Sequence, residues 1–124
     1  MHNKRILLQF QISGLDTATF QKVEVEASFP GGEAAWNKYI QSILEQNIDK
    51  LSKRKTNFGT CEVQFIVDKD GSVRYAEALT MQKSLLAELL IKAIKNGPKW
   101  TPAYQFGKTV KAWRRQKVTL KAPE

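Results

Sequence analysis

Residues 109–121 read TVKAWRRQKVTLK, a stretch that combines β-favouring side chains with five cations. The β-favouring residues are Val110, Trp113, Val118, Thr119 and Leu120, and the cations are Lys111, Arg114, Arg115, Lys117 and Lys121. Buried charges need partners, whereas natural edge strands often carry Lys to deter unwanted pairing. The stretch therefore predicts a strand at the edge of a sheet. Such an edge could also accept a strand from a chosen partner.

The chain of 124 residues is the size of one domain and can bury a modest core without disulfide or metal support. Its formal net charge is +8, so anionic partners come into consideration. The positive charge is concentrated in residues 89–123, which contain no acid, while acids prevail in residues 16–33. This asymmetry fits two explanations, attraction between the two ends within the fold and a functional basic face.

Residues typical of catalytic and metal sites are scarce. The lone Cys61 excludes an internal disulfide and a multi-cysteine metal site, and the lone His2 lies at the terminus. The sequence has no P-loop and no G-x-S-x-G or Rossmann glycine pattern. Residues 68–71 (DKDG) do not start an EF-hand, because Val73 and Leu79 stand where glycine and glutamate are required. We therefore expect no enzyme activity, no metal and no cofactor.

Hydrophobic periodicity predicts a small α+β domain. We expect strands over 20–29, 61–67, 73–79 and 109–121, and helices over 33–50 and 82–96. Trp36, Ile40 and Ile43 begin the apolar stripe of the first helix. The Asp/Gly turn between residues 67 and 73 predicts a β-hairpin. The expected fold is a small antiparallel sheet of three to four strands packed by two helices.

The first 20 residues allow several interpretations. Lys4 and Arg5 followed by apolar residues faintly resemble a secretory signal, but Gln9 interrupts the apolar run and no cleavage site follows. Leu8, Phe10 and Ile12 would instead share one face of a strand. We expect residues 1–20 to be an N-terminal strand, a degenerate signal or a linker remnant, and residues 21–124 to form the domain. The sequence has no apolar run close to the roughly 20 residues of a transmembrane helix.

Three segments in this order resemble one protein family. They are FPGGEAAWNKYIQ (29–41), VQFIVDKDGSVRYAEAL (63–79) and AIKNGPKWTPAYQFGKTVKAWRRQKVTL (93–120). Together they are similar to the C-terminal domain of TonB-type energy transducers, in the form common in Bacteroidetes, over roughly residues 22–121. The sequence departs from the family in residues 47–60, which lack the usual Tyr-Pro element after the first helix.

The resemblance implies a periplasmic binding module, anchored in the inner membrane if it is part of a longer chain. Its partners would be the TonB box of an outer-membrane TonB-dependent transporter and proton-driven motor proteins of the inner membrane. The TonB box would pair with the last strand of the domain. Carried over by position, the partner-binding residues are Thr109, Val110, Lys111, Ala112, Trp113, Arg114, Arg115, Gln116, Lys117, Val118 and Thr119.

Two further interpretations stay open beside this one. Side chains of Lys111, Trp113, Arg115 and Lys117 would share one strand face, where they contact acids of a partner or merely solvate an edge. The alternative function is a basic α+β nucleic-acid-binding or self-associating interaction domain. A nucleic-acid-binding sheet needs several exposed aromatic residues, so we do not expect a nucleic-acid partner. A homodimer formed by edge pairing is compatible with transporter binding.

Overall fold

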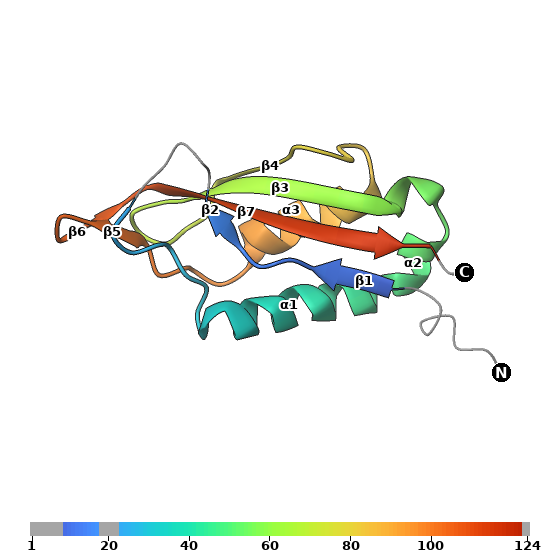
Figure 1. Cartoon of the computed structure of the whole chain (residues 1–124), viewed down its shortest axis with the longest axis horizontal. Coiled ribbons are helices and arrows are strands. Elements are labelled where there is room, and N and C mark those ends of the chain that lie inside the picture. Colours follow the sequence, from blue (N-terminus) through green and yellow to red (C-terminus); the bar gives the residue numbers. More distant parts are fainter. Residues whose placement is uncertain (1–8, 18–22, 123–124) are drawn as a thin grey trace.

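An antiparallel sheet with helices on one of its faces forms the body of the protein (Figure 1). The computed structural model describes residues 9–17 and 23–122. The elements are β1 (Gln9–Ile12), β2 (Asp16–Thr17), α1 (Gly32–Gln46), α2 (Ile48–Ser52), η2 (Lys55–Asn57), β3 (Gly59–Val67), β4 (Tyr75–Ala78), α3 (Leu85–Asn96), β5 (Ala103–Gln105), β6 (Lys108–Val110) and β7 (Ala112–Lys121). The sheet order is β1-β7-β3-β4, β2 also pairs with β7, and β5 and β6 form a separate hairpin. The predicted α+β fold is confirmed.

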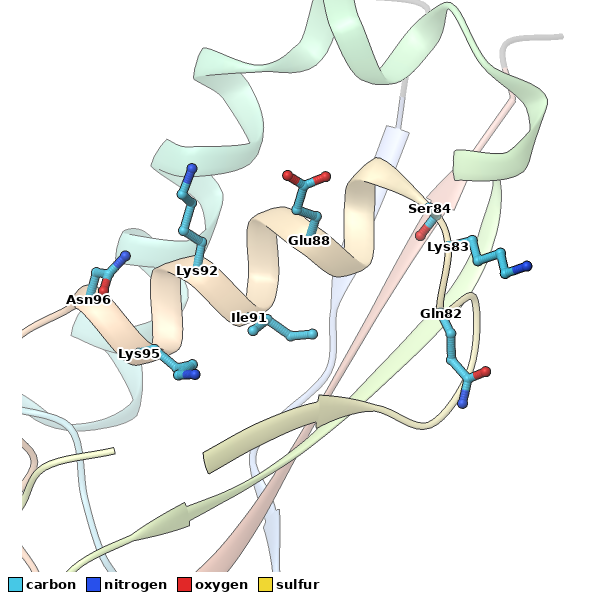
Figure 2. A pocket seen from close by; sticks show the side chains of 8 residues that line it. All are labelled: Gln82, Lys83, Ser84, Glu88, Ile91, Lys92, Lys95 and Asn96. Carbon is cyan, nitrogen blue, oxygen red and sulfur yellow. The ribbon is translucent and has the colours of Figure 1, made fainter. Parts of the chain in front are cut away.

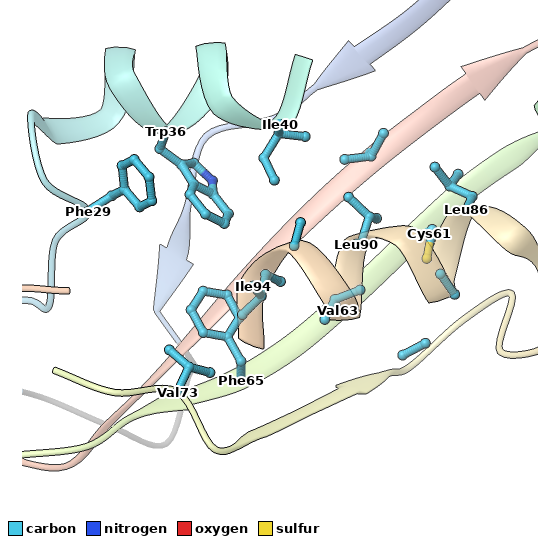
Figure 3. Packing of buried hydrophobic residues seen from close by; sticks show 14 of the residues in the cluster. Phe29, Trp36, Ile40, Cys61, Val63, Phe65, Val73, Leu86, Leu90 and Ile94 are labelled. Carbon is cyan, nitrogen blue, oxygen red and sulfur yellow. The ribbon is translucent and has the colours of Figure 1, made fainter. Parts of the chain in front are cut away.

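Strict alternation of buried residues makes β3 and β7 the centre of the sheet. In β3 the buried side chains are Cys61, Val63, Phe65 and Val67. In β7 they are Ala112, Arg114, Gln116, Val118 and Leu120. Successive side chains of a strand point to opposite faces, so each strand turns one row toward the helices. Figure 3 shows Trp36 and Ile40 of α1 and Leu90 and Ile94 of α3 meeting this row.

The first predicted helix is two helices. The prediction of one helix over 33–50 is wrong, because α1 ends at Gln46 and α2 begins at Ile48. Asn47 interrupts the helical backbone with φ −115°, and its side-chain amide donates to the carbonyl of Ile43 at 2.8 Å. That bond satisfies a carbonyl that the end of α1 leaves without a helical partner. The second predicted helix is α3, whose first turn is capped by Ser84.

The predicted strand over 20–29 is replaced by isolated pairing where the structure describes it. Within residues 23–29, Val25 bridges Tyr104 and Ser28 bridges Thr101. Val25 is 57% exposed and Ala27 is buried, so these alternate residues do not share a face as they would in a regular strand. The segment pairs with Thr101 and with Tyr104 of β5 at one residue each, and not with the main sheet. The rest of the predicted strand lies outside the described residues.

The prediction that β7 is an edge strand is wrong. β3 pairs with β7 over nine residues, from Gly59↔Leu120 to Val67↔Ala112, and β1 and β2 pair along its other side. The strand tolerates its cations because Arg115, Lys117 and Lys121 lie on the face away from the helices. Arg114 is buried, and an ion pair of 3.2 Å with Glu26 compensates for that burial.

The predicted hairpin is present, and its Asp/Gly turn touches the core. Gly71 donates its backbone N–H to the carbonyl of Asp68 at 2.9 Å, and the N–H of Trp100 donates to the carbonyl of Gly71 at 2.8 Å. Gly71 has φ +88°, and a Cβ atom there would overlap with the carbonyl oxygen of Trp100. The turn therefore requires glycine for its backbone conformation and for the close approach of Trp100.

We expect Gly71→Ala to lower the free energy of unfolding by about 2–4 kcal/mol, since left-handed backbone strain adds to the forced displacement of Trp100. Gly107→Ala is the matched control. Gly107 has φ +73°, but apart from its chain neighbours no atom of the described residues lies within 4 Å of the added Cβ, so Gly107→Ala should lower the free energy of unfolding by about 1 kcal/mol. Urea unfolding of both variants measures the difference. Equal losses of unfolding free energy in the two variants would contradict a close contact between Gly71 and Trp100.

The reactivity of the Cys61 thiol tests the packing of the same core. Its side chain is fully buried, and burial raises the pKa of the thiol to about 11. At pH 8 the thiol is then protonated and shielded, and it should react with an aromatic disulfide reagent only as the protein unfolds. The rate at which the reagent releases its aromatic thiol, measured across a urea titration, tests this expectation. Rapid reaction in native buffer would contradict it.

Candidate strand-pairing interface

The backbone of Arg114 to Lys121 that faces away from β3 is the outer edge of β7. β1 occupies part of it, with pairs that run from Gln9↔Lys121 to Ile12↔Val118. β2 occupies another part, and pairs with Arg115 and Arg114. Figure 1 shows β1 and β2 in blue beside the red β7, on the side opposite the green β3. A segment from the start of the chain thus adds to its last strand.

Residues 9–17, called here the strap, follow the outer edge of β7 with one interruption. Phe10 and Ile12 of β1 are half-buried and pack against the core. Ser13 still follows the edge, since its backbone N–H donates to the carbonyl of Lys117 at 3.1 Å. The N–H of Leu15 leaves the sheet and donates to the carboxylate of Glu33 at 3.1 Å, near the start of α1. The strap is therefore two short strands joined by a bend that α1 holds.

A buried glutamine fixes the bend of the strap. Gln116 is fully buried in the middle of β7. Its Nε2 donates to the carbonyl of Ser13 at 2.6 Å and to its neighbour Lys117 at 2.8 Å. Its Oε1 accepts a hydrogen bond of 2.6 Å from the indole Nε1 of Trp36. The amide thus has partners for both of its ends, as a buried polar group requires, and it links α1, β7 and the strap.

Trp36 is held in place by an aromatic cluster under the sheet. Its ring lies 5.1 Å from Phe29, 5.0 Å from Trp100 and 6.3 Å from Phe65, measured between ring centroids. Phe65 and Trp100 also contact each other at 5.2 Å. Tilted aromatic pairs at these distances are favourable beyond the area they bury. The indole N–H therefore has a fixed direction, which in turn orients Gln116.

The face of β7 away from the helices carries charge beside the outer edge. Arg115 donates to the side-chain oxygen of Gln64 at 3.0 Å and lies 4.0 Å from the carboxylate of Glu62. Across the edge, the strap places Asp16 opposite Arg115. Lys117 is exposed on the same face. A strand on this edge thus meets two cations, of which Arg115 already has acidic neighbours.

Two aromatic rings complete that face. Tyr75 of β4 meets Trp113 edge-on, with ring centroids 5.8 Å apart and planes at 85°. The side-chain hydrogen bond to Glu77 is the main cause that raises the pKa of Tyr75, so its hydroxyl stays protonated at neutral pH. Trp113, whose orientation the sequence did not determine, therefore lies on the side of the sheet opposite the helices.

The predicted partner-binding residues fall into two groups. Eight of them, from Ala112 to Thr119, belong to β7. Thr109 and Val110 instead belong to β6 and pair with β5. Lys111 lies between the two strands, where its Nζ is 3.8 Å from the carboxylate of Asp68 in the hairpin turn. The stretch that looked like one strand in the sequence is therefore broken at Lys111.

Other surface features of the described chain do not converge on a chemical site. Figure 2 shows a hollow along α3 in which Glu88 and Lys92 project to one side of the helix and Lys95 to the other. At the β5–β6 hairpin, Tyr104 and Phe106 are exposed. In residues 9–17 and 23–122 no cluster of three or more His, Cys, Asp or Glu could hold a metal ion. No helix in these same ranges has the length and apolar character needed to span a membrane.

The sequence allowed a strand with Phe10 and Ile12 on one face, as β1 has them, but its pairing with β7 and the role of Gln116 were missed. Gln116 was placed among the partner-binding residues, but as a member of an edge strand. The sequence did contain one indication of this role. Gln116 is an even number of positions from Ala112, Val118 and Leu120, so alternation along the strand puts its amide on the core face. Its partner Trp36 lies 80 residues away, and spacing along the sequence does not reveal such a contact.

One of three comparisons with known proteins found a match. A family model described as "Gram-negative bacterial TonB protein C-terminal" matches residues 50–121. This range begins in α2 and ends with β7, so it includes the hairpin, α3 and the strand that carries the outer edge. No curated protein matches the chain significantly. No solved structure does so either.

Gln116→Met should lower the free energy of unfolding by about 2–4 kcal/mol, because it leaves the buried indole N–H of Trp36 without a partner and removes the hydrogen bond to the carbonyl of Ser13. Gln46→Met at the exposed end of α1 is the control and should change stability by about 0.5 kcal/mol or less. Urea unfolding measures both. If the two substitutions cost the same, Gln116 does not link the strap to the core.

Proposed function

The chain belongs to the family of Gram-negative bacterial TonB protein C-terminal domains, and we propose that it binds the TonB box of an outer-membrane transporter by strand addition. The family is one of protein-interaction domains of TonB-type energy transduction, which work in the periplasm with TonB-dependent outer-membrane transporters. In the proposed complex, an extended segment of the transporter pairs with the outer edge of β7. The binding residues are those of β7, together with the neighbouring Thr109, Val110 and Lys111.

The observation that supports this proposal most directly is how the two sides of β7 are paired. One side of the strand is committed to β3 over nine residues. The other side pairs with six strap residues, four in β1 and two in β2, with a bend between them. An edge that takes up short extended segments through main-chain hydrogen bonds is the physical requirement for strand addition. The outer edge of β7 meets that requirement with a segment of its own chain.

Charge beside the edge would select among partner strands. Lys117 and Arg115 lie next to the outer edge on the face away from the helices. Acidic residues within or beside the transporter segment would be attracted to them, while main-chain pairing would supply most of the affinity. These side chains therefore tune binding, and substitutions of them should affect it less than loss of the edge itself.

The same proposal gives the domain a place in force transmission. Joined to an inner-membrane anchor, it would receive force from proton-driven motor proteins and pass it through β7 to the transporter. A homodimer formed by pairing at the outer edge of β7 would compete with the transporter for that edge. Nucleic-acid binding would have only the aromatic pair Tyr75 and Trp113 on this face, whereas a nucleic-acid-binding sheet stacks bases on several exposed aromatic residues.

Titration of the ¹⁵N-labelled protein with a synthetic TonB-box peptide tests the proposal. Amide shifts should concentrate in residues 112–121 and in the strap. A peptide of the same length with proline at alternate positions should not bind, since it lacks the donors that pair with an edge. Shifts confined to β4 or to the β5–β6 hairpin would contradict the proposal.

Salt dependence separates strand addition from a polyanion site when the peptide and a DNA oligonucleotide are titrated in parallel. Affinity for the peptide should change by about threefold or less between 50 and 200 mM salt, whereas an oligonucleotide that uses 6–10 phosphates would lose about 10³–10⁵-fold. Oligonucleotide binding with that steep salt dependence, and no peptide binding, would favour the nucleic-acid interpretation.

A further inference from the structure

The strap occupies the surface that the proposed function assigns to a partner strand. Pairs of β1 and β2 use the backbone of residues 118–121 and 114–115, and Ser13 uses the carbonyl of Lys117 between them. Two strands cannot hydrogen-bond to one edge at the same positions. A partner strand on this edge must therefore take the place of the strap or bind only beyond it.

The attachment of the strap is weaker than that of β3 on the opposite side. β3 pairs with β7 without interruption over nine residues. The strap makes six pairs in two pieces, and its Gln11, Ser13, Gly14 and Asp16 are exposed. Segments with few buried apolar contacts and exposed backbone hydrogen bonds open at the lowest free energy. The strap is thus the more readily released neighbour of β7.

One buried polar atom beside the contact between the strap and α1 lacks a hydrogen-bond partner among the described residues. Phe10 and Ile12 surround a small hollow together with Asn37 and Gln41 of α1. Asn37 lines this hollow, and its side-chain oxygen is buried with no hydrogen-bond partner among residues 9–17 and 23–122. A buried acceptor without a partner destabilises the state that buries it. Release of the strap would open this hollow to water, which offsets part of the lost pairing.

We propose that the strap is an internal competitor for the partner strand, and that a transporter segment binds by displacing residues 9–17 from the outer edge of β7. This inference rests on the proposed function. It also specifies the partner, because a displacing strand must satisfy the same groups as the strap. Such a strand has two apolar residues at alternate positions, in place of Phe10 and Ile12, and an acidic residue that meets Arg115 as Asp16 does.

The register of β1 against β7 identifies a residue pair at which a disulfide can lock the strap in place. Gln11 lies opposite Thr119, and both side chains point away from the helices. Residues directly opposite in an antiparallel pair are about 4.5–5.5 Å apart at Cα, a spacing that a disulfide bridges. Gln11→Cys combined with Thr119→Cys should therefore form an intramolecular disulfide. The native Cys61 is fully buried and stays outside this reaction.

The backbone of Ser13 supplies a way to loosen the strap. Ser13→Pro removes the N–H that donates to Lys117. Ser13→Ala keeps this N–H and is the matched control. Loss of one main-chain bond from the competitor should raise the apparent affinity for a partner strand by about fivefold. The alanine variant should bind like the unchanged protein.

The experiment measures the affinity of a synthetic TonB-box peptide by calorimetry and its location by amide shifts. We expect the oxidised double-cysteine protein to bind at least about tenfold more weakly than the same protein after reduction, and Ser13→Pro to bind about fivefold more tightly than Ser13→Ala. Equal affinity of the oxidised and reduced forms, with shifts still along β7, would overturn displacement but leave the proposed function intact. Weaker binding by Ser13→Pro would likewise overturn it. If no form binds the peptide, the proposed function fails, and the inference that rests on it fails too.

Discussion

The hydrogen bonds of the Gln116 amide hold the parts of the proposed interface together. A polar group in a fully buried position is costly unless each end finds a partner. Here the carbonyl end meets Trp36, which the aromatic cluster fixes, and the amide end meets Ser13 in the strap. The position of the strap on β7 therefore depends on the packing of α1. A change in the packing of α1 under the sheet would therefore alter the position of the strap on the outer edge of β7.

This arrangement gives the last strand two unequal sides. The side toward β3 is long, continuous and part of the core, while the side toward the strap is short and bent. A domain that passes force to a partner needs one side that holds firmly and another that can exchange its neighbour. Strand exchange at a fixed edge keeps the main-chain hydrogen bonds nearly equal in number, so modest differences in side-chain fit decide which strand is bound.

Much of the fold followed from local patterns in the sequence. Alternation predicted β3, the Asp/Gly turn predicted the hairpin, and apolar periodicity predicted α1 and α3. The place of β7 in the sheet was missed, because its cations belong to two different faces of the strand and only their total number suggests an edge. Arg114 alone among them is buried, with Glu26 as its partner. A strand near the start of the chain was among the expectations, but its pairing with β7 was missed because it joins residues about 100 positions apart, and only tertiary packing determines such contacts.

Hydrogen exchange at the strap tests the central claim most directly. The backbone amide of Ser13 should be protected in the free protein and become exposed to exchange when a saturating TonB-box peptide is added. The amides of β7 should stay protected throughout, since the peptide replaces the strap as their neighbour. Unchanged protection of Ser13 with the peptide bound would contradict the account, because the outer edge of β7 would then still belong to the strap.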